Sequence, residues 1–490
     1  MTDPPESENP HRSRRAVAVA AATQMMVVLD TAVLSIALPR MAADLSIGTG
    51  SLPWVMNAYA LPFAGCLLLG GRIADLIGPV ATLRIGLAVF AAASLGAGLA
   101  PSFGVLLVCR AFQGLGGALL SPASLVLLTR STSPGTERDR AIAVWSVTAA
   151  IGASASALFG GLLTQTLGWR WVLLINVVIA PLLAVAGRGA LPRRHPDEQR
   201  PRGLDVPGAV LFMIAFAALD LAATVDGGGG QAVRSAVACG VAAAALVALV
   251  AAERRSRHPL LPLHLLRSPR VAYTNASAVM LLAGNATTGY YTTLYAQDVC
   301  GLAPLTTALW LLPGTVIGVL TSRNVPRLVL AFGERNCRTA GPVLVALAQL
   351  GLAACVYERV PFPALIPLLV VMSVGGSIAV ITLTASATRS LPSHQAGLAG
   401  GLITASGQSG GSIGLAALTG AAAALTTTAG AASAAGRADA VVQQTAVALP
   451  LGFVLTLAAT YLTRRIPLGA ATSVTPVGAV ATAETPDRRS

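Results

Sequence analysis

No lysine occurs in this chain: all 33 basic residues among its 490 are arginines. A phosphate-binding P-loop needs a lysine that reaches the nucleotide phosphates, so ATP hydrolysis by that route is excluded. Catalysis through a lysine Schiff base is excluded for the same reason. The six cysteines are scattered, show no paired spacing and lie mostly in apolar segments. They suggest neither a metal site nor a disulfide framework, and no cofactor is expected.

Charged residues are also scarce, at 11% of the chain, whereas a soluble protein carries about 25%. Hydrophobic residues make up 54% of the chain, and its mean hydropathy is +0.71. Aromatic residues are few while glycine and alanine are abundant, which suits closely packed helices in a membrane. The composition therefore predicts an integral membrane protein that is surrounded by the lipid bilayer and has no nucleic-acid partner.

Apolar segments long enough to cross a bilayer recur along the whole chain. A membrane helix needs about 20 apolar residues, and fourteen such segments are present. They begin near Ala16, Leu52, Ala81, Phe103, Ala141, Trp171, Val206, Val233, Val271, Leu305, Thr339, Pro361, Gly397 and Thr445. The apolar run of the first segment is too long for a signal-peptide core, so this segment is expected to remain as an anchor. The expected fold class is all-α, with fourteen transmembrane helices.

Arginine placement supports this number of segments. With a cytoplasmic N-terminus, the inner loops and tails hold 27 arginines and the outer loops hold five. Such a bias is typical of cytoplasmic loops. The outer five are Arg40, Arg170, Arg234, Arg359 and Arg437, and one further arginine, Arg110, falls inside a segment. We therefore expect a multi-pass protein of the cytoplasmic membrane with both termini in the cytoplasm.

The two longest inner loops divide the chain into five parts. These are a cytoplasmic N-terminal tail (1–15), a six-helix bundle (16–191), linker loops with two inserted helices (192–270), a second six-helix bundle (271–463) and a disordered cytoplasmic tail (464–490). Two six-helix groups around an insert are typical of the repeat architecture of secondary transporters. We expect the chain to act as a monomer.

The stretch "MMVVLDTAVLSIALP" places one acid, Asp30, inside an apolar segment. At 1.5 Å per residue, Asp30 lies roughly 12 Å from the outer face and Arg110 lies roughly 10 Å deep. Ionisable groups inside a membrane usually pair or line a wet cavity, and they often mark proton relays. The pattern predicts that Arg110 keeps Asp30 charged until a proton or substrate arrives. The alternative is a pair that only holds two helices together.

Several motifs, in order, resemble those of one transporter family. "LDTAVLSIALPRMAADL" and "LLVCRAFQGLGGALLSPA" are similar to the first-helix and fourth-helix signatures of the fourteen-helix drug:proton antiporters in the major facilitator superfamily, and "GWRWVLLINV" and "AGLAGGLITASGQSGGSIG" resemble later landmarks. The resemblance covers nearly the whole chain. It implies two six-helix bundles with an inserted helix pair. It also implies a proton-driven exporter of an amphipathic small molecule, a drug or antibiotic, that alternates between inward-open and outward-open states.

Two family motifs are present in altered form. The loop "GGRIADLIGPVATLR" keeps Gly71, Asp75 and Gly78 and carries Arg72, but it lacks the usual basic residues further on. In the family this loop latches one conformation. The fifth-helix antiporter motif keeps Gly152, Gly160 and Gly161, whereas Ser156-Ala157 stands where Gly-Pro is expected. Losing this proline removes a kink site. A uniporter or importer of a small metabolite on the same fold therefore stays open as an alternative.

Polar and aromatic residues are concentrated in the ninth segment. In the family this helix lines the central cavity, so the resemblance implies a substrate cavity formed by Asn275, Asn285, Tyr290, Tyr291 and, from the fourth helix, Gln113. The alternative is an aromatic belt at the membrane interface, which Tyr295 fits better.

One short motif raises the question of an enzyme. "GQSGG" fits the serine-hydrolase pattern, which needs histidine and acid partners on a strand-to-helix turn. It lies in an apolar helix, and all five histidines fall in predicted inner loops or tails. We do not expect an enzyme.

Overall fold

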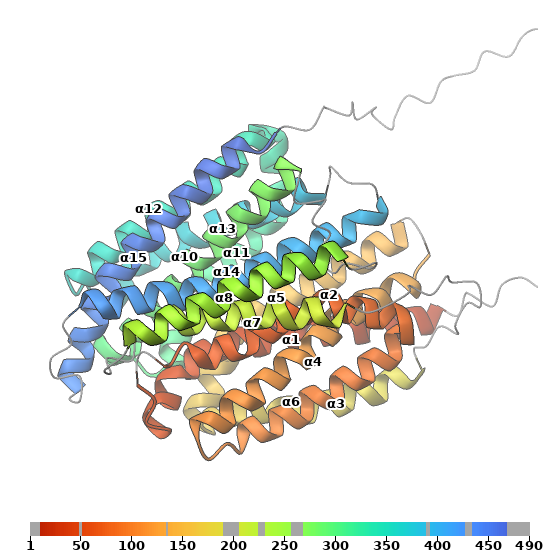
Figure 1. The fold of residues 1–490 in the computed structure, drawn as a ribbon, viewed down its shortest axis with the longest axis horizontal. Coiled ribbons are helices and arrows are strands. Elements are labelled where there is room, and N and C mark those ends of the chain that lie inside the picture. The colour runs from red at the N-terminus through yellow and green to blue at the C-terminus, as the bar shows by residue number, and fades with distance from the viewer. Residues whose placement is uncertain are drawn as a thin grey trace, which may run out of the picture.

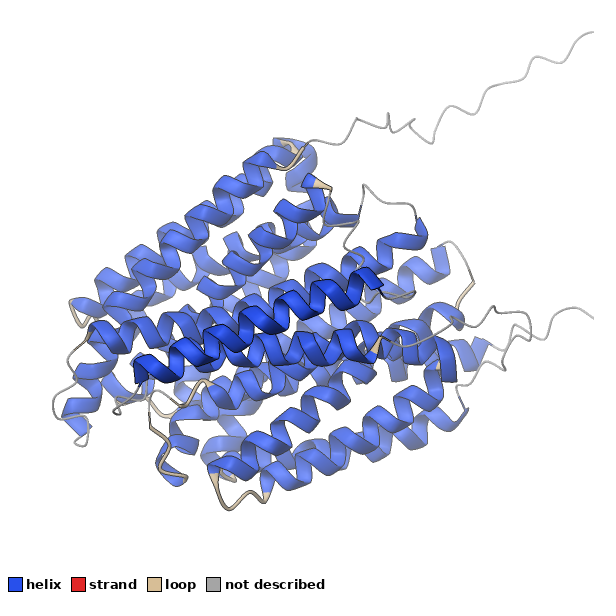
Figure 2. Cartoon of the chain, viewed as in Figure 1, coloured by secondary structure: helices blue, strands red, loops and turns tan. Residues whose placement is uncertain are grey.

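The computed structural model describes residues 10–48, 51–133, 136–189, 205–223, 231–255, 268–388, 393–426 and 434–467. Throughout these ranges the regular elements are helices (Figure 2). The first half contains α1 (Pro10–Asp44), α2 (Trp54–Ile77), α3 (Pro79–Gly98), α4 (Phe103–Arg130), α5 (Thr136–Thr166) and α6 (Trp169–Ala186), which ends in η1 (Gly187–Gly189). Most of the expected tails and linker loops lies outside the described residues.

An inserted pair follows, α7 (Val206–Ala223) and α8 (Gln231–Arg255). The second half contains α10 (Pro269–Leu294), η2 (Tyr295–Val299), α11 (Pro304–Phe332), α12 (Glu334–Tyr357), η3 (Phe362–Leu365), α13 (Ile366–Thr388), α14 (Ser393–Leu425) and α15 (Ala434–Arg465). Each of the fourteen long helices in the described ranges matches one expected segment. The largest difference is at α15, which begins 11 residues before Thr445 because its first turns are polar and lie outside the apolar run.

Length and apolarity differ among these helices. Nine helices in the described part of the chain are long and apolar enough to cross a membrane, and α2 would be a tenth span if its two parts, bent by 53° near Leu68, are counted together. The remaining long helices carry more polar residues or, like α7, are shorter in their apolar part. The chain is therefore a multi-pass membrane protein.

The two halves repeat the same pattern of helix packing. In the first half α3 packs on α4 and α6, and α1 packs on α5; in the second, α12 packs on α13 and α15, and α10 packs on α14. Each half also has a tight turn after its second helix, at Gly78 (φ +93°) after α2 and at Gly333 (φ +83°) after α11. Glycine adopts such left-handed conformations without the steric cost of a Cβ atom.

The halves meet along two pairs of helices, α5 with α11 and α2 with α14. The inserted pair lies across the junction of α2 and α14, and α7 touches both of these helices (Figure 1). At the first junction, a Cβ atom on Gly161 would come within 2.8 Å of the Leu305 Cα. Glycine at this position therefore allows α5 and α11 to approach closely.

The apolar core that joins the halves lies at the end opposite to the start of α1 and the end of α15. One cluster includes Leu34 and Leu38 of α1, Tyr291 and Leu294 of α10, and Leu415 of α14. Toward the other end the buried apolar residues form separate clusters within each half, and the larger one in the first half has a contribution from α7. Apolar packing thus joins the halves at the end away from the start of α1 and the end of α15.

Candidate functional site

Asp30 and Arg110 form a buried ion pair between α1 and α4. Arg110 Nη1 lies 2.7 Å from Asp30 Oδ2, and the two side chains are 1% and 0% exposed. Long charged side chains are almost never buried this completely unless they are paired. The structure therefore places the expected acid and base in direct contact.

Three neutral side chains complete the surroundings of the Asp30 carboxylate. Asn176 of α6 donates its Nδ2 hydrogen to Asp30 Oδ1 at 2.6 Å. Gln113 of α4 accepts from Arg110 Nη1 at 3.0 Å and donates from Nε2 to the Ser94 hydroxyl of α3 at 2.6 Å. Gln113 Nε2 also lies 3.5 Å from Asp30 Oδ1. We name this group, Asp30, Arg110, Gln113, Asn176 and Ser94, the carboxylate network.

Helix α2 holds the arginine from the other side. Arg110 Nε donates to the Val55 carbonyl at 3.2 Å, and the guanidinium lies over the Tyr59 ring, 4.5 Å from its centroid. This approach needs a small residue on α4, because a Cβ atom on Gly114 would overlap the Tyr59 backbone. The charge of Arg110 is thus shared among a carboxylate, an amide oxygen, a backbone carbonyl and an aromatic face.

One buried amide in the network has an unused acceptor. Asn176 is 1% exposed, and its Oδ1 atom has no hydrogen-bond partner among the described residues. An unpaired buried polar atom is unfavourable, so such atoms commonly mark positions where a hydrogen bond forms in another state of the protein. Here the atom belongs to the side chain that already touches Asp30.

The residues expected to line a substrate cavity do not form one group. Gln113 belongs to the carboxylate network, whereas Asn275 joins α10 to α14 by accepting from the Ser406 hydroxyl at 2.9 Å. Tyr290 and Tyr291 meet edge to face with centroids 5.2 Å apart, inside the core that joins the halves. The Tyr291 hydroxyl and Asn285 Oδ1 are buried atoms without a partner in the described structure. Arg270 Nε, at the start of α10, is a third such atom.

The aromatic-belt interpretation of these tyrosines is wrong for the described structure. Tyr290 and Tyr291 are 4% and 0% exposed, and Tyr295 is also buried, with its hydroxyl donating to the Val360 carbonyl at 2.7 Å. A belt residue would face lipid at the membrane interface. Packing between the halves covers all three side chains instead.

The expected latch lies where α2 turns into α3. Asp75 is exposed and pairs with Arg130 at the end of α4, with 3.7 Å between Asp75 Oδ1 and Arg130 Nη2. Arg72 is partly buried, and Gly78 forms the left-handed turn described above. A Cβ atom on Gly71 would lie 3.7 Å from Pro122 of α4, an ordinary contact. The latch residues thus join α2 to α4 within one half.

The α5 glycines pack against α1 on either side of Asp30. A Cβ atom on Gly152 would come within 2.9 Å of Met25, and one on Gly160 would come within 2.7 Å of the Val33 carbonyl oxygen. Ser156 lies between the two glycines, one turn from each, and is also buried. The third glycine, Gly161, faces α11 instead. The motif therefore sets the distance between α5 and the segment of α1 that carries the acid.

The second half holds a neutral counterpart of the network. Gln349 follows the Gly333 turn by the same number of residues as Ser94 follows Gly78. Gln349 is fully buried, donates to the Thr288 hydroxyl at 3.3 Å and accepts from the Thr456 hydroxyl at 3.0 Å. A Cβ atom on Gly284 of α10 would lie 2.7 Å from Gln349 Nε2. The partners of Gln349 in this cluster are therefore neutral hydroxyls, whereas the first-half network contains a carboxylate and a guanidinium.

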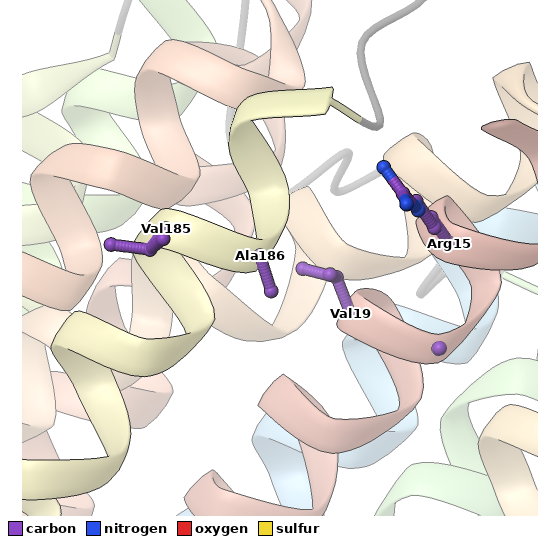
Figure 3. A pocket seen from close by; sticks show the side chains of 5 residues that line it. Arg15, Val19, Val185 and Ala186 are labelled. Carbon is purple, nitrogen blue, oxygen red and sulfur yellow. The ribbon is translucent and has the colours of Figure 1, made fainter.

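Two pockets open at the end of the bundle that carries the start of α1. One, of about 270 Å³, lies between α1 and α6 and is lined by Arg15, Ala18, Val19, Val185 and Ala186. Figure 3 shows Arg15 and Val19 on one helix and Val185 and Ala186 on the other, with Val19 and Ala186 toward one another. The other, of about 430 Å³, lies between α12 and α15. Neither pocket includes a residue of the carboxylate network.

Comparison with known proteins places the chain among membrane transporters. The model of the Major Facilitator Superfamily matches residues 20–415. A cephamycin export protein of Amycolatopsis lactamdurans is 35% identical over 82% of this chain and 84% of its own length. A puromycin resistance protein of Streptomyces alboniger is 35% identical over 81% of this chain and 79% of its own length. A lincomycin resistance protein of Streptomyces lincolnensis is 33% identical over 81% of this chain and 82% of its own length.

Solved structures share the fold at low sequence identity. A POT family transporter in complex with a thioalcohol-conjugated peptide has a TM-score of 0.66 and 14% identity, over 93% of this chain and 97% of its own. The xylose transporter XylE from E. coli, in a partially occluded inward-open conformation, has a TM-score of 0.61 and 13% identity, over 93% of this chain and 98% of its own.

Proposed function

The chain belongs to the Major Facilitator Superfamily, and from this premise we propose that it exports an amphipathic small molecule, of the drug or antibiotic class, across the cytoplasmic membrane in exchange for protons. The relatives named above for export or resistance support the direction and the class of substrate. The observation that carries the coupling is the carboxylate network, because it holds the one buried acid of α1 in contact with an arginine and two amides.

The network supplies a physical route for a proton to change the structure. With Asp30 charged, Arg110 and Asn176 both donate to it. Once a proton binds, one carboxyl oxygen becomes a donor and needs an acceptor. If the Asn176 amide rotates by half a turn, its unpaired Oδ1 atom becomes the acceptor for the Asp30 proton. Arg110 keeps its hydrogen bonds to Gln113 and Val55. Protonation thus removes the charge that holds Arg110 of α4 to α1, whereas Asn176 of α6 keeps one hydrogen bond to Asp30 with its direction reversed.

The same proposal includes the finer topology. We propose that all fourteen long helices span the membrane, with both termini in the cytoplasm and a monomer as the working unit. The arrangement of α7 and α8 beside α2 and α14 supports an inserted pair outside the two repeated halves. The substrate then enters between the halves from the end that lacks the joining core, toward Asn285 and Tyr291.

A uniporter or importer is the second candidate, and one observation favours it. Helix α5 runs from Thr136 to Thr166 without an internal proline, so the kink that the antiporter motif would introduce has no proline to cause it. Inverted membrane vesicles separate the candidates, because only an exporter accumulates substrate inside them when a proton gradient is imposed.

Transport should depend on the proton gradient and not on ATP. We expect a protonophore to abolish export of a test drug from cells that express the chain, because no lysine is available for a P-loop. Export should persist when ATP is depleted and the gradient is held by respiration. The measurement is drug efflux under each condition, with cells that lack the protein as the control. Efflux that followed ATP instead of the gradient would contradict the proposal.

Labelling should place the α15 start and the α11 end on opposite faces. Arg437 and Arg327 are both exposed, so Arg437→Cys and Arg327→Cys, each in a background without the six native cysteines, give accessible thiols. In intact cells an impermeant maleimide should label the cysteine at 437 and should reach that at 327 only after permeabilisation. Labelling in the opposite order would overturn the proposed orientation.

A further inference from the structure

From the pocket between α12 and α15 we infer a binding site for the phosphate headgroup of an anionic phospholipid. The pocket is lined by Arg335, Asn336, Thr339, Ala340, Val343 and Arg464. Two arginines, one from each helix, therefore line the same space of about 430 Å³. Guanidinium groups bind phosphate oxygens in pairs through their planar fork of donors. The amide of Asn336 has one further N–H, because its other hydrogen is donated to the Phe332 carbonyl at 2.9 Å.

The two arginines of the pocket are not matched by acids in the described residues. Arg335 and Arg464 are exposed and have no ion-pair partner among the described residues. One turn deeper on α12, the buried Arg338 pairs with Glu334 at 3.6 Å and is repelled by both Arg270 and Arg335. Arg338 Nη2 donates to the Ile466 carbonyl at 3.0 Å and so fixes the end of α15 against α12. An anion in the pocket would relieve this repulsion without displacing the contact that shapes the site.

The depth and the walls of the pocket select a lipid over a free anion. The arginines lie at the ends of their helices, Arg335 one residue after α12 begins and Arg464 one residue before α15 ends. Toward the membrane interior the wall changes to Ala340 and Val343. Further along, α12 exposes Leu347 and α15 exposes Leu457, which offer apolar surface to an acyl chain. Basic pockets between helices, beside the headgroup region, are the usual recognition sites for anionic lipids.

The test uses the purified full-length protein in detergent. Its thermal unfolding is followed as dioleoyl phosphatidylglycerol, dioleoyl phosphatidylcholine or sodium phosphate is added. The pocket variant is Arg335→Gln/Arg464→Gln. The matched control is Arg323→Gln/Arg327→Gln, which removes two exposed arginines from α11 outside the pocket. Native mass spectrometry counts the lipids bound to each protein, so the result does not depend on the unfolding temperature alone.

We expect phosphatidylglycerol to raise the unfolding temperature of the wild type and of the control, with phosphatidylcholine and sodium phosphate having far smaller effects. The apparent affinity for phosphatidylglycerol should fall at least about tenfold in the pocket variant, since about 1.4 kcal/mol of lost phosphate contact corresponds to that factor. Equal lipid affinity in the pocket variant and the control would overturn the proposal. So would an equal effect of sodium phosphate, which would show a free-anion site, or of phosphatidylcholine, which would show an apolar groove only.

Discussion

Asp30→Asn is expected to fold and insert normally but to lose export driven by a proton gradient. Asparagine keeps the shape of the side chain and still accepts a hydrogen bond from Arg110, while a neutral amide costs less inside the membrane than a carboxylate. It cannot, however, take up and release a proton. In inverted vesicles at matched expression, drug accumulation by this variant should fall to the level of vesicles without the protein.

The control is Asp439→Asn, which removes an exposed carboxylate paired with Arg359 at the start of α15. This variant should keep export close to that of the wild type, because its acid lies outside the carboxylate network. Substrate binding without a gradient, measured by fluorescence or calorimetry, should survive in both variants. Wild-type, pH-dependent accumulation by Asp30→Asn would reduce Asp30 to a residue that packs two helices.

Arg110→Ala is expected to abolish export and also to destabilise the protein. The substitution leaves the Asp30 carboxylate buried without its counter-charge, together with the Gln113 and Val55 oxygens that Arg110 satisfies. Removing one partner of a buried pair typically costs about 3–5 kcal/mol. The unfolding temperature in detergent should therefore fall clearly below that of the wild type. Arg110→Lys should restore export only in part, since an ammonium group lacks the planar fork that reaches three acceptors.

A double variant separates the two roles of the arginine. Asp30→Asn/Arg110→Ala has no buried charge left at the site, so it should be more stable than Arg110→Ala alone while remaining inactive. If the double variant were as unstable as the single one, the loss would come from the Tyr59 and Val55 contacts rather than from an unpaired carboxylate.

Part of this site follows from counting residues along apolar segments. The ends of α1 and α4 are marked by polar loops, so the common depth of Asp30 and Arg110 can be estimated, and a charge in lipid requires a partner. Asn176 and Ser94 could not be found in this way, because neutral polar residues are common in membrane helices. The motif "GWRWVLLINV" contained Asn176, but nothing in it indicated that α6 turns this side chain toward α1.

The burial of the α10 and η2 tyrosines and the start of α15 could not be predicted from local sequence patterns. The burial of Tyr290, Tyr291 and Tyr295 depends on how the two halves meet at α1 and α10, and no local pattern encodes that contact. The polar first turns of α15 are helical although they are not apolar, which moved the start of the helix. Gly78 was identified from the loop motif, and its left-handed backbone (φ +93°) explains why glycine is needed there, whereas the matching turn at Gly333 (φ +83°) was not predicted.

The contrast between the charged carboxylate network of the first half and the neutral cluster around Gln349 in the second has an electrical consequence. With Asp30 unprotonated, the carboxylate network is neutral as a whole, because it contains one carboxylate and one guanidinium. It gains a single positive charge when Asp30 is protonated. The neutral cluster around Gln349 gains none. A cycle that exports one neutral molecule per proton would therefore carry one net charge inward, and a membrane potential of 100 mV would contribute about 2.3 kcal/mol to it. Export by this chain should then be measurable as a current.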